Sequence, residues 1–351
     1  LDSSLTIAAN GTLSAPRGNL DIFAGSTGSP NGNFNNSGTF THNNGTVITH
    51  GHDSHFQDSG TVEPVFYNLT LGVNDSGHGD IQLNDSRNIT IENSLTSTGA
   101  GTLRPASMTT TIGTATSAGN ITMGAEDDIV MKSNSDTPIF QGASSLYPAE
   151  IKTNQPFNFG IKTSENWQFK WVDFQVALDT NTGGSNAATI TLTGDCEFDA
   201  VTIAAGDKLD LNGQRAEFSG NLSNQSTGSG NGIDYDGMLY FTGSGRMDSD
   251  GASTNLDKLT VVQQGTSTTD ADLASDGTIK TFFYNQPSVT QKNHRGAIQT
   301  IVGAGTWTCG SGETPDFTDL TVATGGTLDG SSSTLTVAGD FTTSGGLLGA
   351  S

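Results

Sequence analysis

The chain has 351 residues, of which 32% are apolar, and 36 acidic residues against 14 Lys and Arg give a formal net charge of -22. This balance disfavours a phosphate-binding surface of clustered Lys and Arg, so we expect no nucleic-acid partner and no attraction to an anionic membrane. No apolar run approaches the length that spans a bilayer, so we expect no membrane insertion. The low apolar content favours a narrow solenoid with a thin core over one broad globular core.

A phrase of the type Leu-Thr-Ile recurs along the chain. Its copies start at positions 5, 69, 129, 201, 259 and 320, and the longest interval lies between the third copy and the fourth. The copy at 129 is the degenerate Ile129-Val130-Met131. Repetition at a near-constant interval is typical of arrays of supersecondary units. The sequence therefore predicts modules of about 60 residues, each holding about three turns of a solenoid.

Three stretches of the chain overlay without gaps. Their apolar positions are 5, 7, 13, 20 and 22, then 201, 203, 209, 216 and 218, then 320, 322, 328, 335 and 337. Apolar residues two apart share one face of a strand, and turn formers such as Ala-Asn-Gly and Ala-Gly-Asp stand between the pairs. We therefore expect an all-β fold, a parallel β-helix (β-solenoid), with tandem β-sandwich domains as the alternative.

The chain divides into three parts on this basis. Residues 1–145 and 186–351 carry the solenoid pattern, and residues 146–185 form an aromatic-rich insertion or an enlarged rung within the longest interval. The chain opens at Leu1 without an initiator Met or a signal-peptide pattern. We therefore expect a processed or truncated piece, with solenoid modules continuing beyond Ser351.

The aromatic segment contains the first candidate site. Trp167, Phe169 and Trp171 alternate with Gln168 and Lys170, which predicts three rings on one face of a strand. One interpretation is a local core beneath a loop. The other is a carbohydrate-binding platform, because exposed aromatic faces bind the apolar faces of saccharides.

A histidine cluster is the second candidate. His50 and His52 are expected on one strand face, and His55 could join them from the following turn, a spacing at which imidazoles share a transition metal. The motif resembles the His-x-His iron sites of trimeric phage fibre tips. The alternative is a polar strand exposed to solvent.

Acidic turns are the third candidate. Asp234-Tyr235-Asp236-Gly237 and Asp248-Ser249-Asp250-Gly251 are similar to fragments of Ca²⁺ loops, but neither continues to a Glu at the bidentate position, which favours an ordinary Asp-Gly turn. We expect that no cofactor is required. Cys196 and Cys309 are expected to be small buried apolar residues, because several turns of a solenoid would hold them too far apart for a disulfide.

Two phrases carry a resemblance to known proteins. Residues 35–47 read Asn-Asn-Ser-Gly-Thr-Phe-Thr-His-Asn-Asn-Gly-Thr-Val, and residues 66–71 read Phe-Tyr-Asn-Leu-Thr-Leu. This pattern resembles the repeat of large bacterial surface and adhesin proteins and of fibre-like proteins of marine phages. The resemblance implies a secreted or virion-borne β-solenoid.

These observations together predict a structural, adhesive β-solenoid of an extracellular fibre. The leading form is a phage tail-fibre or virion-associated fibre protein, and a bacterial cell-surface adhesin is the alternative. The expected partners are other fibre or virion subunits, as a homotrimer, and a host surface glycan. A polysaccharide-degrading β-helix enzyme is the second alternative, but Gly77-His78-Gly79 and Asp127-Asp128 stand in the reverse of the order found in polygalacturonases, so we expect no enzyme.

Overall fold

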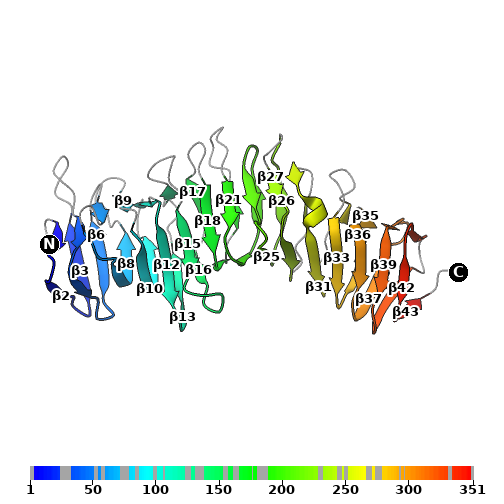
Figure 1. The fold of residues 1–351 in the computed structure, drawn as a ribbon, viewed down its shortest axis with the longest axis horizontal. Helices are drawn as coiled ribbons and strands as arrows, with labels where there is room; N and C mark the ends of the chain where they lie inside the picture. Colours follow the sequence, from blue (N-terminus) through cyan, green and yellow to red (C-terminus); the bar gives the residue numbers. More distant parts are fainter. Residues whose placement is uncertain are drawn as a thin grey trace. The chain divides into compact units, whose positions relative to one another are not determined.

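The structure is a computed structural model. It describes residues 4–23, 33–50, 54–56, 60–71, 79–83, 87–97, 101–105, 107–122, 128–130, 138–152, 157–160, 166–175, 177–179, 189–227, 232–242, 247–248, 252–265, 271–272, 279–291, 294–295, 297–330 and 334–348. The chain forms two compact units, Leu1–Cys196 (unit 1) and Glu197–Ser351 (unit 2). Each unit is a stack of short parallel strands (Figure 1), so the predicted parallel β-solenoid is confirmed.

Unit 1 is wound from three parallel sheets, and strand β22 (Cys196–Phe198) contains its boundary with unit 2. Sheet 1 contains β1 (Leu5–Ile7), β4 (Phe34–Asn36), β7 (Ser54–Phe56), β9 (Gly79–Leu83), β11 (Gly101–Pro105), β14 (Asp128–Val130), β17 (Phe157–Gly160) and β20 (Leu178–Asp179). Sheet 2 contains the pair β2 (Thr12–Ser14) and β5 (Thr39–Thr41), and the ladder β10 (Ile89–Ser97), β12 (Thr109–Thr114), β15 (Ile139–Gly142), β18 (Asn166–Lys170) and β21 (Thr189–Leu192). Sheet 3 contains β3 (Asn19–Phe23), β6 (Thr46–His50), β8 (Val65–Leu71), β10, β13 (Ser117–Thr122), β16 (Ala149–Ile151) and β19 (Val172–Phe174).

Unit 2 has the same three-sided winding. Sheet 1 contains β23 (Val201–Ile203), β26 (Leu222–Asn224) and β29 (Met247–Asp248), and sheet 2 contains β24 (Lys208–Asp210), β27 (Gly232–Asp234) and β30 (Ser253–Thr254). Sheet 3 contains β25 (Arg215–Phe218), β28 (Met238–Phe241), β31 (Thr260–Gln264), β33 (Ile279–Asn285), β36 (Ala297–Val302), β39 (Asp319–Val322) and β42 (Phe341–Thr343). Shorter ladders complete the unit: β32 (Ala271–Asp272) with β35 (His294–Arg295), β38 (Asp316–Phe317) with β41 (Thr336–Val337), and β34 (Ser288–Gln291), β37 (Gly305–Cys309), β40 (Gly326–Asp329) and β43 (Gly346–Leu348). A single 3₁₀ turn, η1 (Leu256–Lys258), is the helical element of the described residues.

The core of each unit consists of apolar side chains stacked in register from turn to turn. In sheet 3 of unit 1 one such ladder runs through Leu20, Val47, Leu69, Leu95, Ile121, Ile151 and Phe174. In unit 2 the corresponding ladder begins Ala216, Leu239, Val261 and Phe282. Fully burying one such side chain stabilises the fold by about 1.5–3 kcal/mol, so the ladders are the main source of stability along each stack.

The length of one turn differs from the interval at which the sequence repeats. The sheet 1 strands of unit 1 begin at positions 5, 34, 54, 79, 101, 128, 157 and 178. One turn therefore takes roughly 20–30 residues, a length typical of solenoid repeats. Each gapless stretch of the overlay corresponds to one turn: residues 5–22 supply β1, β2 and β3, and residues 201–218 supply β23, β24 and β25.

The Leu-Thr-Ile phrase consequently does not mark the same strand in every module. Its copies at 5, 129 and 201 lie in sheet 1, whereas those at 69, 259 and 320 lie in sheet 3 or at its edge. The interval from the first copy to the second covers two turns and part of a third. One turn is therefore longer than expected, and a module of about 60 residues holds fewer than the three whole turns that the sequence predicted.

The aromatic segment takes its place in the stack as an ordinary part of the solenoid. Its strands β16 to β20 continue sheets 1, 2 and 3 in register, and the turn from β17 to β20 is of ordinary length. The described strands of residues 146–185 thus belong to the stack, and the division into compact units falls at Cys196. An insertion or enlarged rung at residues 146–185 stays a prediction.

Candidate functional site

The predicted aromatic platform is mostly core. Trp167 and Phe169 point inward from β18, and both side chains are fully buried. The Trp167 ring lies 5.8 Å from that of Phe140, and the Phe169 ring meets that of Phe174 edge-on at 5.2 Å. The interpretation as a local core is confirmed for these two residues, and neither has a face on which a sugar ring could stack.

Trp171 lies apart from them, at the corner between β18 and β19. Its φ of 55° is left-handed, so the alternation of the strand stops at Lys170. Its carbonyl accepts the N–H groups of Gly142 at 3.1 Å and Ala149 at 2.9 Å, and the Lys170 ammonium lies 4.1 Å from the ring centroid. The prediction that all three rings share one strand face is therefore wrong, because the chain turns before the third ring.

His50 is the last residue of β6, and its side chain contacts two residues of β3 in the preceding turn. Its Nε2 lies 2.8 Å from Oδ1 of Asp21, and its ring stacks on Phe23 with centroids 4.1 Å apart. His52 lies outside the described residues, and His55 belongs to β7 in sheet 1, with its side chain outside the description. No group of three His, Cys, Asp or Glu that could hold a metal is present within the described ranges, and the metal site at His50, His52 and His55 stays a prediction.

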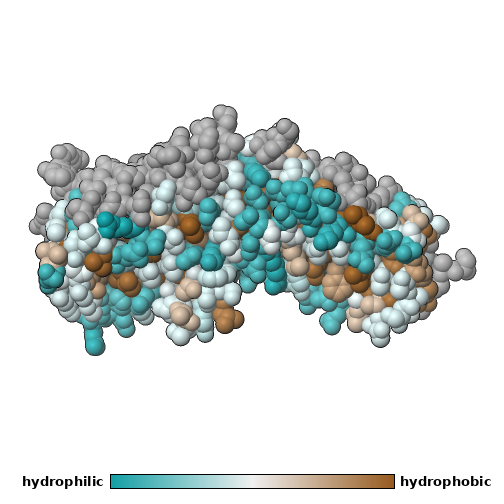
Figure 2. Space-filling view, in the orientation of Figure 1, coloured by the Kyte–Doolittle hydropathy of each residue, from teal (hydrophilic) through white to brown (hydrophobic). Residues whose placement is uncertain are grey.

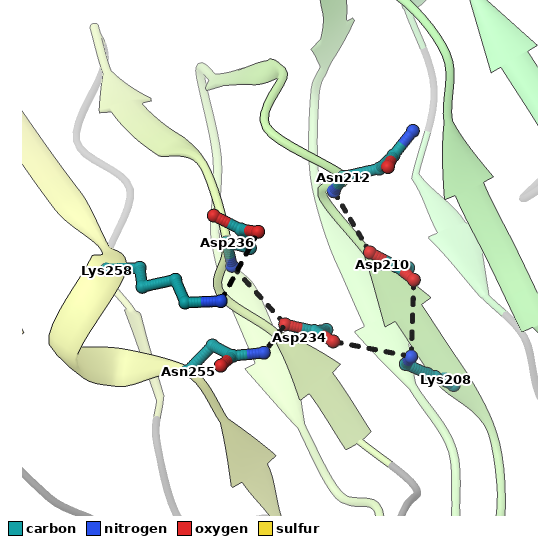
Figure 3. Close-up of polar contacts among 7 residues, drawn as sticks. All are labelled: Lys208, Asp210, Asn212, Asp234, Asp236, Asn255 and Lys258. Carbon is teal, nitrogen blue, oxygen red and sulfur yellow. Dashed lines mark hydrogen bonds and ion pairs between the residues drawn. The ribbon is translucent and has the colours of Figure 1, made fainter.

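The acidic turn at Asp234 is occupied by protein groups (Figure 3). The Lys208 ammonium lies 3.2 Å from Asp210 and 3.5 Å from Asp234. Asp234 also accepts the Asn255 amide at 2.7 Å and the N–H of Asp236 at 3.4 Å. These contacts are those of a cross-linked Asp-Gly turn at the corner between sheets 2 and 3. Asp250 of the other predicted loop lies outside the described residues, and Ca²⁺ in acidic turns stays a prediction.

The outer face of sheet 3 in unit 1 is mostly polar. One of its rows, which follow the register from strand to strand, contains Thr46, Asn68, Ser94, Asn120, Glu150 and Asp173, and a second contains Ile48, Thr70, Thr96 and Thr122. Neighbouring turns are linked across these rows: Ser94 donates to Asn68 at 2.8 Å, and the Thr70 and Thr96 hydroxyls lie 2.9 Å apart. The rows therefore cross-link turns and present hydrogen-bonding groups to water.

Asp173, at the end of one of these rows, has a raised pKa. Burial is the larger cause, and the carboxylate of Glu150, opposite in register on β16, raises the pKa further. The Gln175 amide donates to Asp173 at 2.8 Å, and Lys152 lies nearby, and both lower the pKa. The raising contributions prevail, so the charged form of Asp173 destabilises unit 1.

We expect Asp173→Asn to stabilise the protein at neutral pH by about 0.2–1 kcal/mol, the range for cross-strand pairs. The folded pKa is raised, so wild-type stability falls as pH rises through it, and the advantage of the variant disappears below the unfolded pKa near 3.8. Urea unfolding from pH 3 to pH 8 measures this difference. An advantage that grows toward acid pH would contradict the assignment.

Both cysteines are free and buried, as the sequence predicts. Cys196 and Cys309 are each 2% exposed, in β22 and β37.

The outer face of sheet 3 in unit 2 differs from its counterpart in unit 1. One row contains Tyr240, Val262, Phe283 and Ile301, from β28, β31, β33 and β36; we call this row the outer strip. Tyr240, Phe283 and Ile301 are half-buried, and Val262 between the two rings is only 7% exposed. Gly303 packs beside the Phe283 ring. A Cβ atom at position 303 would lie 3.3 Å from Cε2 of Phe283, so a side chain there would press on the ring.

Polar side chains border the outer strip. The Arg215 guanidinium lies 4.4 Å from the Tyr240 ring centroid and pairs with Glu217. On the other side the Tyr240 hydroxyl donates to Gln264, and the Asn285 amide donates to the same oxygen at 3.3 Å. Figure 2 shows apolar residues reaching the surface over β33 and β36 among polar neighbours, and the arrangement is that of an apolar row between hydrogen-bonding groups.

Sequence reasoning missed the outer strip because each of its members comes from a different turn of the solenoid. Within each strand they read as ordinary apolar residues. To align these four residues, one would have to know which residues pair between the strands of successive turns.

Comparisons with known proteins give no family. No family model matches the chain, and no curated protein and no solved structure matches it. Within the part of the chain that the structure describes, no helix is long and apolar enough to cross a membrane.

Proposed function

We propose that the protein is a structural, adhesive β-solenoid of an extracellular fibre. The leading form is a phage tail-fibre or virion-associated fibre protein, and a bacterial cell-surface adhesin is the alternative. One observation carries the proposal: both units stack short parallel strands around ladders of mostly apolar side chains, which in unit 2 include the buried Thr300 between Phe282 and Leu320. Such a stack resists bending and stretching, because each turn is hydrogen-bonded along its length to the next.

The outer faces support an adhesive role. The strands of each unit turn their buried apolar side chains inward, so the outer faces of the sheets can meet partners. Other fibre subunits, in a homotrimer, would pack against some of these faces, and a host glycan would bind another.

An enzyme acting on polysaccharide is the competing function, and we propose that this chain is not one. Glycosidases place two carboxyl groups about 5–9.5 Å apart on either side of the scissile bond. The carboxylates of Asp210 and Asp234 instead share the Lys208 ammonium. A reducing-end assay on neutral and acidic polysaccharides tests this point, and release of new ends would support the enzyme.

Immunogold electron microscopy tests the proposal for the source organism. Antibodies against the 351-residue chain are applied to intact cells, to cell sections and to purified virions. We expect labelling of virion fibres, and labelling of the outer cell surface would favour the adhesin alternative. Labelling confined to the cell interior would overturn an extracellular function.

A further inference from the structure

We propose that the outer strip of unit 2 is a binding site for a neutral saccharide chain. The inference deepens the proposed adhesive function and rests on it, since it names the surface and the ligand class. It begins from the contrast between the outer rows of the two units. Hydrogen-bonding Thr, Asn and Ser occupy most of these positions in unit 1, with Ile48 as an apolar exception, whereas Tyr240, Val262, Phe283 and Ile301 form a continuous apolar row in unit 2.

The fold does not require apolar residues at these positions. The core of the same strands is already filled by the inward residues Leu239, Val261 and Phe282, which are at most 1% exposed. Outward Thr serves the equivalent sheet of unit 1, where Thr70 and Thr96 hydrogen-bond to each other. The partly exposed Tyr240, Phe283 and Ile301, packed around the buried Val262, are therefore apolar groups at the surface that the core does not need, which favours a binding site.

The Tyr240 and Phe283 rings are spaced along the stack at a distance that suits successive units of a linear ligand. Tyr240 and Phe283 lie on strands separated by β31, so two strand spacings, about 9.6 Å, separate them. Val262 fills the space between them and Ile301 extends the row. The apolar faces of successive sugar units in an extended chain can pack on such a row, one ring after another.

The polar border matches the other face of a sugar. Arg215, Gln264 and Asn285 place guanidinium and amide groups beside the row, where they contact Glu217, Tyr240 and one another, and sugar hydroxyls would share these hydrogen bonds. The net charge of -22 repels polyanions. The ligand that the strip fits is therefore an uncharged glycan and not an acidic one.

The size of the strip argues against a protein partner. A stable protein interface buries about 800 Å² and about 20–30 residues on each side. The outer strip is one residue wide and crosses four strands. A saccharide chain is narrow enough to use such a row.

The test is a glycan array probed with the 351-residue chain and its variants. Tyr240→Thr with Phe283→Thr installs the residue that unit 1 uses at such positions. Phe283→Leu removes one ring and keeps the apolar row. Thr321→Ala, an outward residue on β39 that lies beyond the last member of the outer strip, is the control. Circular dichroism and melting temperature confirm that each variant is folded.

We expect the wild type to bind neutral glycans and to leave acidic glycans unbound. The double variant should bind at least tenfold more weakly, Phe283→Leu about three- to tenfold more weakly, and Thr321→Ala as the wild type. Binding of acidic glycans alone, or binding unchanged in the folded double variant, overturns the site while adhesion through another surface stands. Absence of any bound glycan overturns the site, and the immunogold result then decides separately whether the chain is a fibre component.

Discussion

Trp167→Ala is expected to lower the free energy of unfolding by about 3–5 kcal/mol, the cost of truncating a buried aromatic side chain. The indole is fully buried and packs 5.8 Å from the Phe140 ring, with Ile190 opposite it on β21. Each turn of a solenoid contacts its neighbours only, so the loss should concentrate in β15, β18 and β21. Urea unfolding followed by circular dichroism measures the total, and hydrogen exchange locates it.

Trp171→Asn is the matched control for this variant. Trp171 is half-exposed and left-handed, and Asn enters that conformation more readily than Trp. The change loses the contact with Lys170, worth about 0.5–1 kcal/mol at an exposed site. A Trp167→Ala protein as stable as the wild type would show that the indole is not part of the core, and would restore the sugar-stacking interpretation.

Gly232→Ala is expected to destabilise unit 2 by about 2–5 kcal/mol, because a left-handed conformation and a close approach coincide there. Gly232 has a φ of 90°, and its Cβ would overlap the carbonyl oxygen of Ala252 in the next turn. The left-handed conformation costs about 1–2 kcal/mol for a residue with a side chain, and overpacking costs about 1–3 kcal/mol. The two turns would have to separate, which weakens the bond from the N–H of Ile233 to Ala252, now 3.2 Å.

Gly206→Ala separates these two contributions. Gly206 has nearly the same φ, 91°, but no atom lies within 4 Å of its Cβ position. It should therefore lose only the conformational part, about 1–2 kcal/mol. Thermal unfolding of both variants measures the difference, and equal losses would mean that the spacing of the turns at Gly232 is not tight.

The strand pattern was predictable because it is local. Apolar residues two apart, as at Leu5 and Ile7 or Val201 and Ile203, share a strand face whatever surrounds them. The turn formers between them end each strand, so the gapless overlay predicted one complete three-strand turn. The length of the remaining turns was not predictable, because loops of different length return the chain to the same sheet.

The candidate sites were less predictable. Alternation at Trp167 and Phe169 shows that their rings share a face, but not whether that face is core or surface. At Trp171 a left-handed corner ends the alternation, and no sequence rule assigns a tryptophan to that conformation. His50 finds Asp21 and Phe23 on β3, one whole turn earlier in the chain.

The sequence by itself determined the all-β class, the repeating turn and the alternation of inward and outward residues, since each follows from short-range periodicity. Only the tertiary structure decided the register of one turn upon the next. Register depends on loop lengths, and these differ from one turn to the next. It aligns Tyr240, Val262, Phe283 and Ile301 into one row and buries Trp167, because a side chain in a solenoid meets neighbours that are a whole turn away in the chain.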